Sequence, residues 1–220
     1  CALPICARRL DEGDYTLNKE LGYISLKSAL NNDEILAVAY QYTYQGKVYT
    51  VGELSNSASE FAKPLALKLL KSTDKSPMHP TWDLMMKNIY ALGAYQVQQS
   101  KFSLNIMYKN DSTGIDLRYL TEGPIAKEPL LKVMGLDHLD SHGNEKPKGD
   151  GIFDFVDGYT IIAQNGKVIF PVVEPFGSHL AKKLGNNKLL VDKYCFQELY
   201  DSTLTTAQEF AEKNKFYLEG

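Results

Sequence analysis

Alternation of side chains runs through residues 35–44 and predicts a long β-strand. Successive side chains of a strand point to opposite faces, so the alternation divides this segment into two sets. The first set holds Leu36, Val38, Tyr40, Tyr42 and Tyr44, and the second holds Ile35, Ala37, Ala39, Gln41 and Thr43. A turn at QGK and a returning strand at residues 47–53 (KVYTVGE) complete a hairpin. Because aromatic and β-branched residues favour pleated surfaces, we expect a mainly β fold.

A second hairpin pattern occurs twice. Residues 13–26 (GDYTLNKELGYISL) resemble residues 157–170 (DGYTIIAQNGKVIF). Each copy has a Tyr-Thr pair and a glycine seven residues after the tyrosine, at Tyr15, Thr16, Gly22 and at Tyr159, Thr160, Gly166. Asn-Gly, at residues 165–166, is a strong tight-turn signal. Two interpretations stay open: duplication of a hairpin unit, or convergence on the same turn chemistry.

The remaining pattern predicts further strands and a few short helices. We expect strands within residues 65–71, 101–110, 115–120 and 129–136. Helices are expected at 80–94, with Thr81 as N-cap and Gly93 as stop; at 178–185, between Ser178 and Gly185; and at 203–214. The expected class is α+β, with antiparallel hairpins forming β-sandwich-like subdomains. The expected parts are residues 1–7, 8–75, 76–150 and 151–220.

Composition and motifs exclude several classes of function. The net charge of -3 gives no indication of a nucleic-acid partner, which requires a basic face. The longest apolar stretches are too short for a membrane-spanning helix. No nucleophile elbow, P-loop or dinucleotide fingerprint occurs, so we expect no enzymatic activity and no cofactor. Cys195 stands alone in DKYCFQELY and is interpreted as a small buried hydrophobe.

One polar stretch has the residue types of a metal site. Oxygen ligands suited to calcium occur close together, with glycines between them, at Asp137, Asp140, Asn144, Asp150 and Asp154. The spacing departs from the helix-loop-helix calcium template, because His142 takes a ligand position and the glutamate at position twelve is missing. His138 and His142 are four residues apart but in a predicted loop, which does not favour zinc. A calcium loop and a solvated acidic turn both remain open.

The first residues do not resemble a natural start. The chain begins CALPIC without a methionine, and CALPI is also what common sequencing-adapter DNA encodes. We therefore expect residues 1–7, including Cys1 and Cys6, to be a non-native leader on a fragment of a longer protein.

Four segments together resemble the SprA-type, or Sov-type, cell-surface proteins of Bacteroidota. They are RRLDEGDYTLNKELGYISLKSALNNDEILAVAYQYTYQGKVYTVGE, SPMHPTWDLMMKNIYALGAYQV, GDGIFDFVDGYTIIAQNGKVIFPVVEPFGSHL and FQELYDST. They occur in this order, and the resemblance covers Arg8 to Gly220. It implies an internal part of a large single-chain β-barrel, the outer-membrane translocon of type IX secretion, which also supports gliding motility. No catalytic residue is implied.

The resemblance also implies partners and a location. These partners are the rest of the parent barrel chain, a lateral-gate outer-membrane protein, a periplasmic plug protein and secreted cargo proteins. The interleaved helices and the acidic loop do not suit a lipid-facing wall, so we expect an extra-membrane part on the cell-surface side. Two alternatives stay open: a stand-alone surface adhesin or glycan-binding module, with calcium as a stabiliser, and an accessory domain of a secreted hydrolase.

Overall fold

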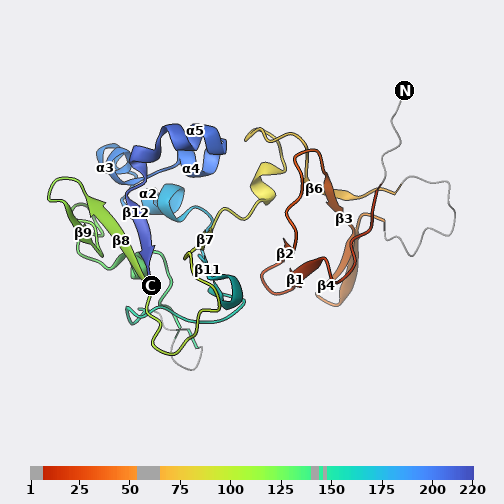
Figure 1. Cartoon of the computed structure of the whole chain (residues 1–220), viewed down its shortest axis with the longest axis horizontal. Coiled ribbons are helices and arrows are strands. Elements are labelled where there is room, and N and C mark those ends of the chain that lie inside the picture. Colours follow the sequence, from red (N-terminus) through yellow and green to blue (C-terminus); the bar gives the residue numbers. More distant parts are fainter. Residues whose placement is uncertain (1–6, 54–64, 140–143, 146–147) are drawn as a thin grey trace. The chain divides into compact units, whose positions relative to one another are not determined.

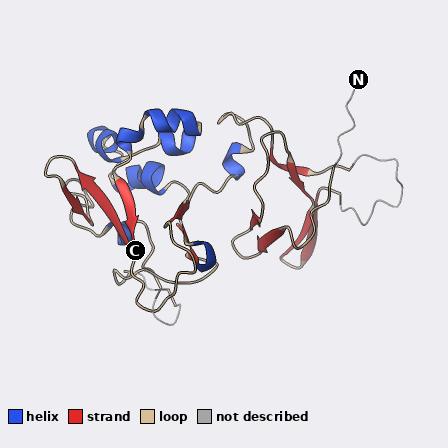
Figure 2. Ribbon diagram, viewed as in Figure 1, coloured by secondary structure: helices blue, strands red, loops and turns tan. Residues whose placement is uncertain are grey.

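The computed structural model describes residues 7–53, 65–139, 144–145 and 148–220. Among the described residues the structure is mainly β, with 26% in strands and 20% in helices, and every strand pair is antiparallel. The predicted fold class is therefore confirmed. The chain divides into two compact units, Cys1–Met85 and Met86–Gly220 (Figures 1 and 2).

The described part of the first unit contains three two-stranded sheets. β1 (Tyr15–Asn18) pairs with β2 (Tyr23–Leu26), β3 (Leu36–Val38) with β6 (Lys68–Lys71), and β4 (Tyr40–Tyr44) with β5 (Lys47–Val51). The predicted strand at 35–44 is thus interrupted at Ala39. At this residue the pairing partner changes from β6 to β5. Gly52 packs closely against Ala39, because a Cβ at position 52 would lie only 3.1 Å from the Ala39 Cβ. A short 3-10 turn at Trp82–Leu84 follows.

The second unit contains two three-stranded sheets and several short helices. The sheet orders are β12 (Phe216–Glu219), β8 (Asn105–Asn110), β9 (Ile115–Leu117) and β10 (Ile161–Ile162), β11 (Lys167–Ile169), β7 (Ile89–Ala91). The α-helices are α1 (Leu130–Val133), α2 (Leu180–Lys183), α3 (Lys188–Tyr194), α4 (Glu198–Asp201) and α5 (Leu204–Glu209). A π-type turn at Pro175–His179 and 3-10 turns at Ala163–Asn165 and Ala211–Lys213 complete the set.

The buried apolar core of the described chain lies entirely in the second unit. Aromatic rings hold its centre: Phe176 stacks on Phe216 with ring centroids 4.8 Å apart, and Tyr90 meets Phe170 edge-on at 5.1 Å. In the described part of the first unit no apolar side chain is buried, and Thr81 is the one buried residue. The two units therefore differ in what stabilises them, because only the second has the apolar burial that normally drives folding.

The division of the chain differs from the one we expected. Residues 76–85 belong to the first unit, whereas 86–150 and 151–220 form one unit together. The reason is strand pairing across the expected boundary. β7 pairs with β11, and the C-terminal β12 pairs with β8.

The predicted helix at 80–94 is wrong. Only Trp82–Leu84 forms a 3-10 turn, and Thr81 makes no side-chain cap; its hydroxyl instead lies 2.8 Å from Nδ1 of His79. Ile89–Ala91 is a strand whose register sets Tyr90 opposite Val168. The side-chain Nδ2 of Asn88 also donates to the backbone carbonyl of Phe170 at 2.6 Å. Pairing with β11 therefore overrides a local helical pattern.

The predicted strand at 129–136 is also wrong, because Leu130–Val133 forms helix α1 with Leu130, Leu131 and Val133 buried. A short apolar run alone cannot separate a buried strand from a buried helix. The helix predicted at 178–185 is present as α2, although Ser178 lies in the preceding π-type turn and caps nothing. The helix predicted at 203–214 is present as α5, where Thr203 Oγ1 accepts from the Thr206 amide at 3.4 Å.

Candidate functional site

The acidic stretch is organised around the carboxylate of Asp137. This side chain is fully buried, and its Oδ2 accepts a hydrogen bond from the Gly151 amide at 2.9 Å. The Asp150 amide donates to the Asp137 carbonyl at 3.2 Å. A Cβ on Gly149, which has φ +61°, would lie 2.4 Å from Oδ2. Glycine at 149 therefore lets the turn close over the carboxylate, a role that the sequence pattern did not reveal.

The second carboxylate oxygen of Asp137, Oδ1, accepts no hydrogen bond from the described residues. In the described structure, Oδ1 is buried without a hydrogen-bond partner, and Nε2 of His138 lies 3.8 Å away. Burying a carboxylate oxygen without a hydrogen bond costs free energy. Among the described members of the stretch, Asp137 is therefore the one whose environment calls for a further donor or cation.

Asp154 and Asp150 mainly brace the same turn. Asp154 Oδ2 accepts from the Leu139 amide at 2.7 Å, and Asp150 Oδ1 accepts from the Ile152 amide at 2.9 Å. Burial raises the pKa of Asp154, the Leu139 hydrogen bond opposes this, and the charges of Asp150 and Asp137 add to the rise. The carboxylate of Asp154 is thus close enough to those of Asp137 and Asp150 to be repelled by them.

The calcium prediction is not decided by these contacts. Of the predicted ligands, Asp140 lies outside the described residues, as does His142, and Asn144 is exposed. Within the described ranges, no group of three or more His, Cys, Asp or Glu side chains is placed to hold a metal ion. What the geometry supports directly is a hydrogen-bonded acidic turn, and calcium binding stays a prediction.

The two repeated hairpins share one register. In the first, Asn18 is opposite Tyr23 and the loop closes with Gly22 at φ +70°; in the second, Ile162 is opposite Lys167 and the loop closes with Gly166 at φ +56°. Tyr15 and Thr16 lie within β1, whereas Tyr159 and Thr160 precede β10. Thr160 Oγ1 accepts from the Val156 amide at 2.9 Å and donates to the Asp154 carbonyl.

The surroundings of the two loop glycines differ sharply. A Cβ on Gly166 would lie 2.0 Å from the Ala94 carbonyl oxygen, whereas a Cβ on Gly22 would meet nothing within 4 Å. The repeat is therefore a shared turn geometry placed in one enclosed and one open environment.

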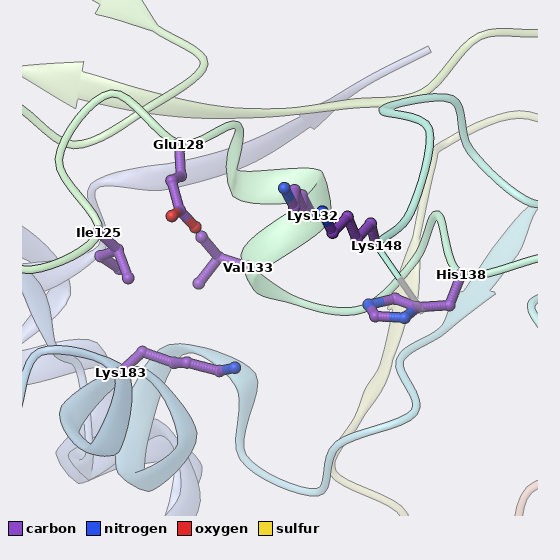
Figure 3. A pocket seen from close by; sticks show the side chains of 7 residues that line it. All are labelled: Ile125, Glu128, Lys132, Val133, His138, Lys148 and Lys183. Atoms are coloured by element: carbon purple, nitrogen blue, oxygen red, sulfur yellow. The ribbon is translucent and has the colours of Figure 1, made fainter. Parts of the chain in front are cut away.

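A hollow of about 460 Å³ lies beside the acidic turn. It is lined by Ile125, Glu128, Lys132, Val133, His138, Lys148 and Lys183. Figure 3 shows Lys132 and Val133 entering from α1 and Lys183 from α2. The lining is cationic, but all three lysines are exposed, so water screens their charges. Such a hollow can attract an anionic group weakly. Its described lining holds one carboxylate, Glu128, and one imidazole, His138, and Figure 3 shows these two side chains apart from each other.

The buried polar groups of the second unit serve structure. The Tyr90 and Tyr200 hydroxyls lie 2.6 Å apart, and the Phe176 amide donates to the Tyr200 hydroxyl at 3.1 Å. Burial raises the pKa of both phenols, that of Tyr200 to about 12, so neither ionises near neutral pH. Burial also raises the pKa of the Cys195 thiol to about 11. The prediction that Cys195 is a small buried side chain is confirmed, since it is 7% exposed.

Aromatic side chains gather on one face of the β4–β5 hairpin. Tyr42 and Tyr49 face each other across the strands and stack with centroids 5.1 Å apart and planes at 15°. Tyr40 lies 6.2 Å from Tyr42. The sequence predicted that the three tyrosines of β4 share a face, but alternation gave no sign that this face would remain exposed.

Comparison with known proteins adds no identification. No protein-family model matches the chain, and no curated protein matches it. Among the described residues, none of the helices is long and apolar enough to cross a lipid bilayer.

Proposed function

We propose that this chain is a structural, non-catalytic part of an outer-membrane protein-conducting translocon, of the kind used in type IX secretion and gliding motility. The observation that carries the proposal is the resemblance of four segments, in one order, from Arg8 to Gly220. Two of these segments are long and contain uncommon combinations of aromatic, proline and glycine residues. They are therefore more specific than a β-rich composition.

The geometry supports a structural role in two ways. The second unit has a packed core, and burial raises the pKa values of Cys195 and Tyr200 to about 11 and about 12, so neither side chain ionises near neutral pH. The first unit presents two-stranded sheets with no buried apolar side chain among its described residues. Isolated two-stranded sheets are marginal in water. A unit of this kind is suited to packing against other parts of a larger assembly.

In this proposal the chain is an extra-membrane part on the cell-surface side. Its neighbours are the rest of the parent barrel chain, a lateral-gate outer-membrane protein, a periplasmic plug protein and the secreted cargo. The chain supports or caps the conducting pore or provides docking surfaces, and it performs no covalent chemistry.

A second candidate function is a stand-alone adhesin or glycan-binding module. The specific observation in its favour is the exposed tyrosine face of β4–β5, where Tyr42 and Tyr49 are stacked. Aromatic rings that expose a flat apolar surface with a polar tip are suited to binding partners that are partly apolar. This candidate does not account for the four resembling segments.

The test uses the full-length gene in a bacterium that carries it. One strain lacks the codons for Met86–Gly220, and a control strain carries Leu189→Ala, which changes a side chain that is 80% exposed. We expect the deletion to abolish cargo secretion and gliding while Leu189→Ala leaves both unchanged. Immunoblots of outer-membrane fractions measure the parent protein in each strain.

A second variant covers the case in which the deletion removes the parent protein from the membrane. The double substitution Tyr42→Ser and Tyr49→Ser changes an exposed face without touching the core. Normal secretion in a strain that contains the shortened parent protein would refute the translocon role. Normal secretion combined with lost surface adhesion in the double variant would favour the adhesin.

A further inference from the structure

The β4–β5 hairpin is exposed on both faces. All five β4 residues and the first four β5 residues are exposed, including Tyr40, Tyr42, Tyr44, Tyr49 and Val48 at 41 to 66%. Monomeric proteins seldom leave several large apolar side chains together in water, and such patches mark interaction surfaces. The exposed hairpin is therefore a candidate interaction surface, and its backbone and side chains indicate which kind of partner can bind it.

The hairpin's turn type determines which backbone N–H and C=O groups of β4 point away from β5. Gln45 and Gly46 both have positive φ, at 48° and 74°, as in a two-residue type I′ turn. The flanking pair Tyr44 and Lys47 is then a hydrogen-bonded pair, and such pairs alternate with non-bonded ones along the ladder. The N–H and C=O groups of Gln41 and Thr43 therefore point outward along the other edge of β4, which pairs with no further strand among the described residues.

The opposite edge is open in the same way. Val48 and Thr50 belong to the non-bonded pairs, so their backbone groups point outward along β5. The two edges differ in chemistry. β4 reads YQYTY and contains no charge, proline or glycine, whereas β5 begins with Lys47, the one charged residue between positions 40 and 51. Natural proteins protect free edges with lysine, proline or bulges, and β4 carries none of these.

We propose that the free edge of β4 binds an extended strand of a separate partner polypeptide, which extends the hairpin to a three-stranded sheet. The outward groups of Gln41 and Thr43 repeat every two residues, which is the spacing of another strand's donors and acceptors. The partner strand is uncharged along most of its length, with apolar side chains at alternate positions. These side chains lie beside the tyrosines of β4.

Charge and composition of the hairpin further restrict the chemistry of the partner strand. Lys47 lies on the tyrosine face opposite Tyr44, so an acidic residue at that end of the partner strand complements it. A sugar chain could contact the tyrosine rings, but it would leave the backbone groups of the edge unused. The inference does not depend on the proposed function, because an adhesin with the same open edge would need the same partner.

Two proline substitutions form a matched pair for the test. Thr43→Pro removes an outward N–H from the β4 edge without breaking a backbone bond to β5. Thr50→Pro does the same on the β5 edge, and it also removes the hydrogen bond that Thr50 Oγ1 accepts from Gln41 Nε2 at 3.2 Å. Proline is tolerated in strands at such edge positions. The probe is a fluorescent, end-blocked heptapeptide of alternating valine and threonine that ends in glutamate. A second peptide of the same sequence carries N-methyl groups on alternate amides of one edge.

Binding is measured by fluorescence anisotropy with the full 220-residue chain. We expect the unmodified peptide to bind the unchanged chain and Thr50→Pro alike, at least tenfold more weakly to Thr43→Pro, and the N-methylated peptide not to bind. Equal binding of the two peptides, or of the two proline variants, would overturn the proposal. If circular dichroism shows that both proline variants are unfolded, the proposal is tested by comparing the binding of the two peptides to the unchanged chain.

Two other occupants give different results in the same assays. If the chain forms a dimer that Thr43→Pro abolishes and binds no peptide, the occupant is a second copy and the proposal fails. If a soluble β-linked glucose hexasaccharide binds, and Tyr42→Ser but not Thr43→Pro abolishes that binding, the surface recognises glycans and the proposal also fails.

Discussion

Replacing Gly166 with alanine tests whether close packing of the second repeated hairpin against residue Ala94 stabilises the second unit. Gly166 has φ +56°, and an added Cβ would lie 2.0 Å from the carbonyl oxygen of Ala94 and 2.9 Å from its carbonyl carbon. Both are backbone atoms, so no side-chain rotation relieves the clash. The Leu92 amide donates to the Gly166 carbonyl at 2.8 Å, which ties this turn to the end of β7.

The expected cost of Gly166→Ala has two parts. A left-handed conformation costs an L-residue about 1–2 kcal/mol. Forcing an extra methyl group into a closed space costs about 1–3 kcal/mol, and the backbone contact places this site toward the upper end. Together we expect a loss of about 2–5 kcal/mol in the free energy of unfolding of the second unit.

Gly22→Ala is the matched control, because Gly22 has φ +70° and an added Cβ meets nothing within 4 Å. It carries only the conformational cost of about 1–2 kcal/mol. The assay is amide hydrogen exchange by mass spectrometry on peptides that cover 15–26 and 89–97, in rising urea. Fluorescence of Trp82 does not serve, since the one tryptophan lies in the first unit. Equal losses for the two variants, or a loss below about 1 kcal/mol for Gly166→Ala, would refute the packing argument.

Three further predictions concern the buried polar groups. Tyr200→Phe leaves the Phe176 amide without its acceptor and should cost about 1–3 kcal/mol in urea unfolding, whereas Tyr90→Phe keeps that bond and should cost less. Burial raises the pKa of Asp154, so its contribution to stability is present at low pH and is lost as the pH rises through the folded-state pKa. Asp154→Asn should therefore raise the urea midpoint at pH 7, and the gain should shrink toward pH 4; an unchanging difference would contradict this. If the acidic stretch binds calcium, millimolar calcium should raise the melting temperature of the chain and not that of Asp137→Asn, and no shift in either would remove calcium from consideration.

Much of the strand pattern could be predicted from the sequence, because alternation is local. The hairpin of β4 and β5 follows from alternation around a Gln-Gly turn, and the shared turn of the two repeats follows from Gly22 and Gly166. The wrong predictions at 80–94 and 129–136 share a cause. In both, the element is decided by a distant partner: Ile89–Ala91 by pairing with β11, and α1 by burial of three of its side chains.

The candidate site was only partly predictable for a related reason. Aspartates between glycines indicated a turn rich in oxygen ligands, and the structure does gather Asp137, Asp150 and Asp154. The sequence could not show that Asp137 would be fully buried, nor that Gly149 would lie against its carboxylate. Burial depends on which segments fold over a residue, and this information is spread over the whole chain.

Strands β4 and β8 differ in burial although their sequence patterns are similar. Each has an alternating sequence, yet β4 is exposed along its length whereas Ile106, Met107 and Tyr108 of β8 are buried. The difference lies in their neighbours: within the described ranges β8 is flanked by β12 and β9, whereas β4 pairs only with β5. A second neighbouring strand would make β4 an inner strand like β8. The partner strand proposed for its open edge supplies that neighbour, which is why the edge, rather than the tyrosine face alone, is the place to look for the binding partner.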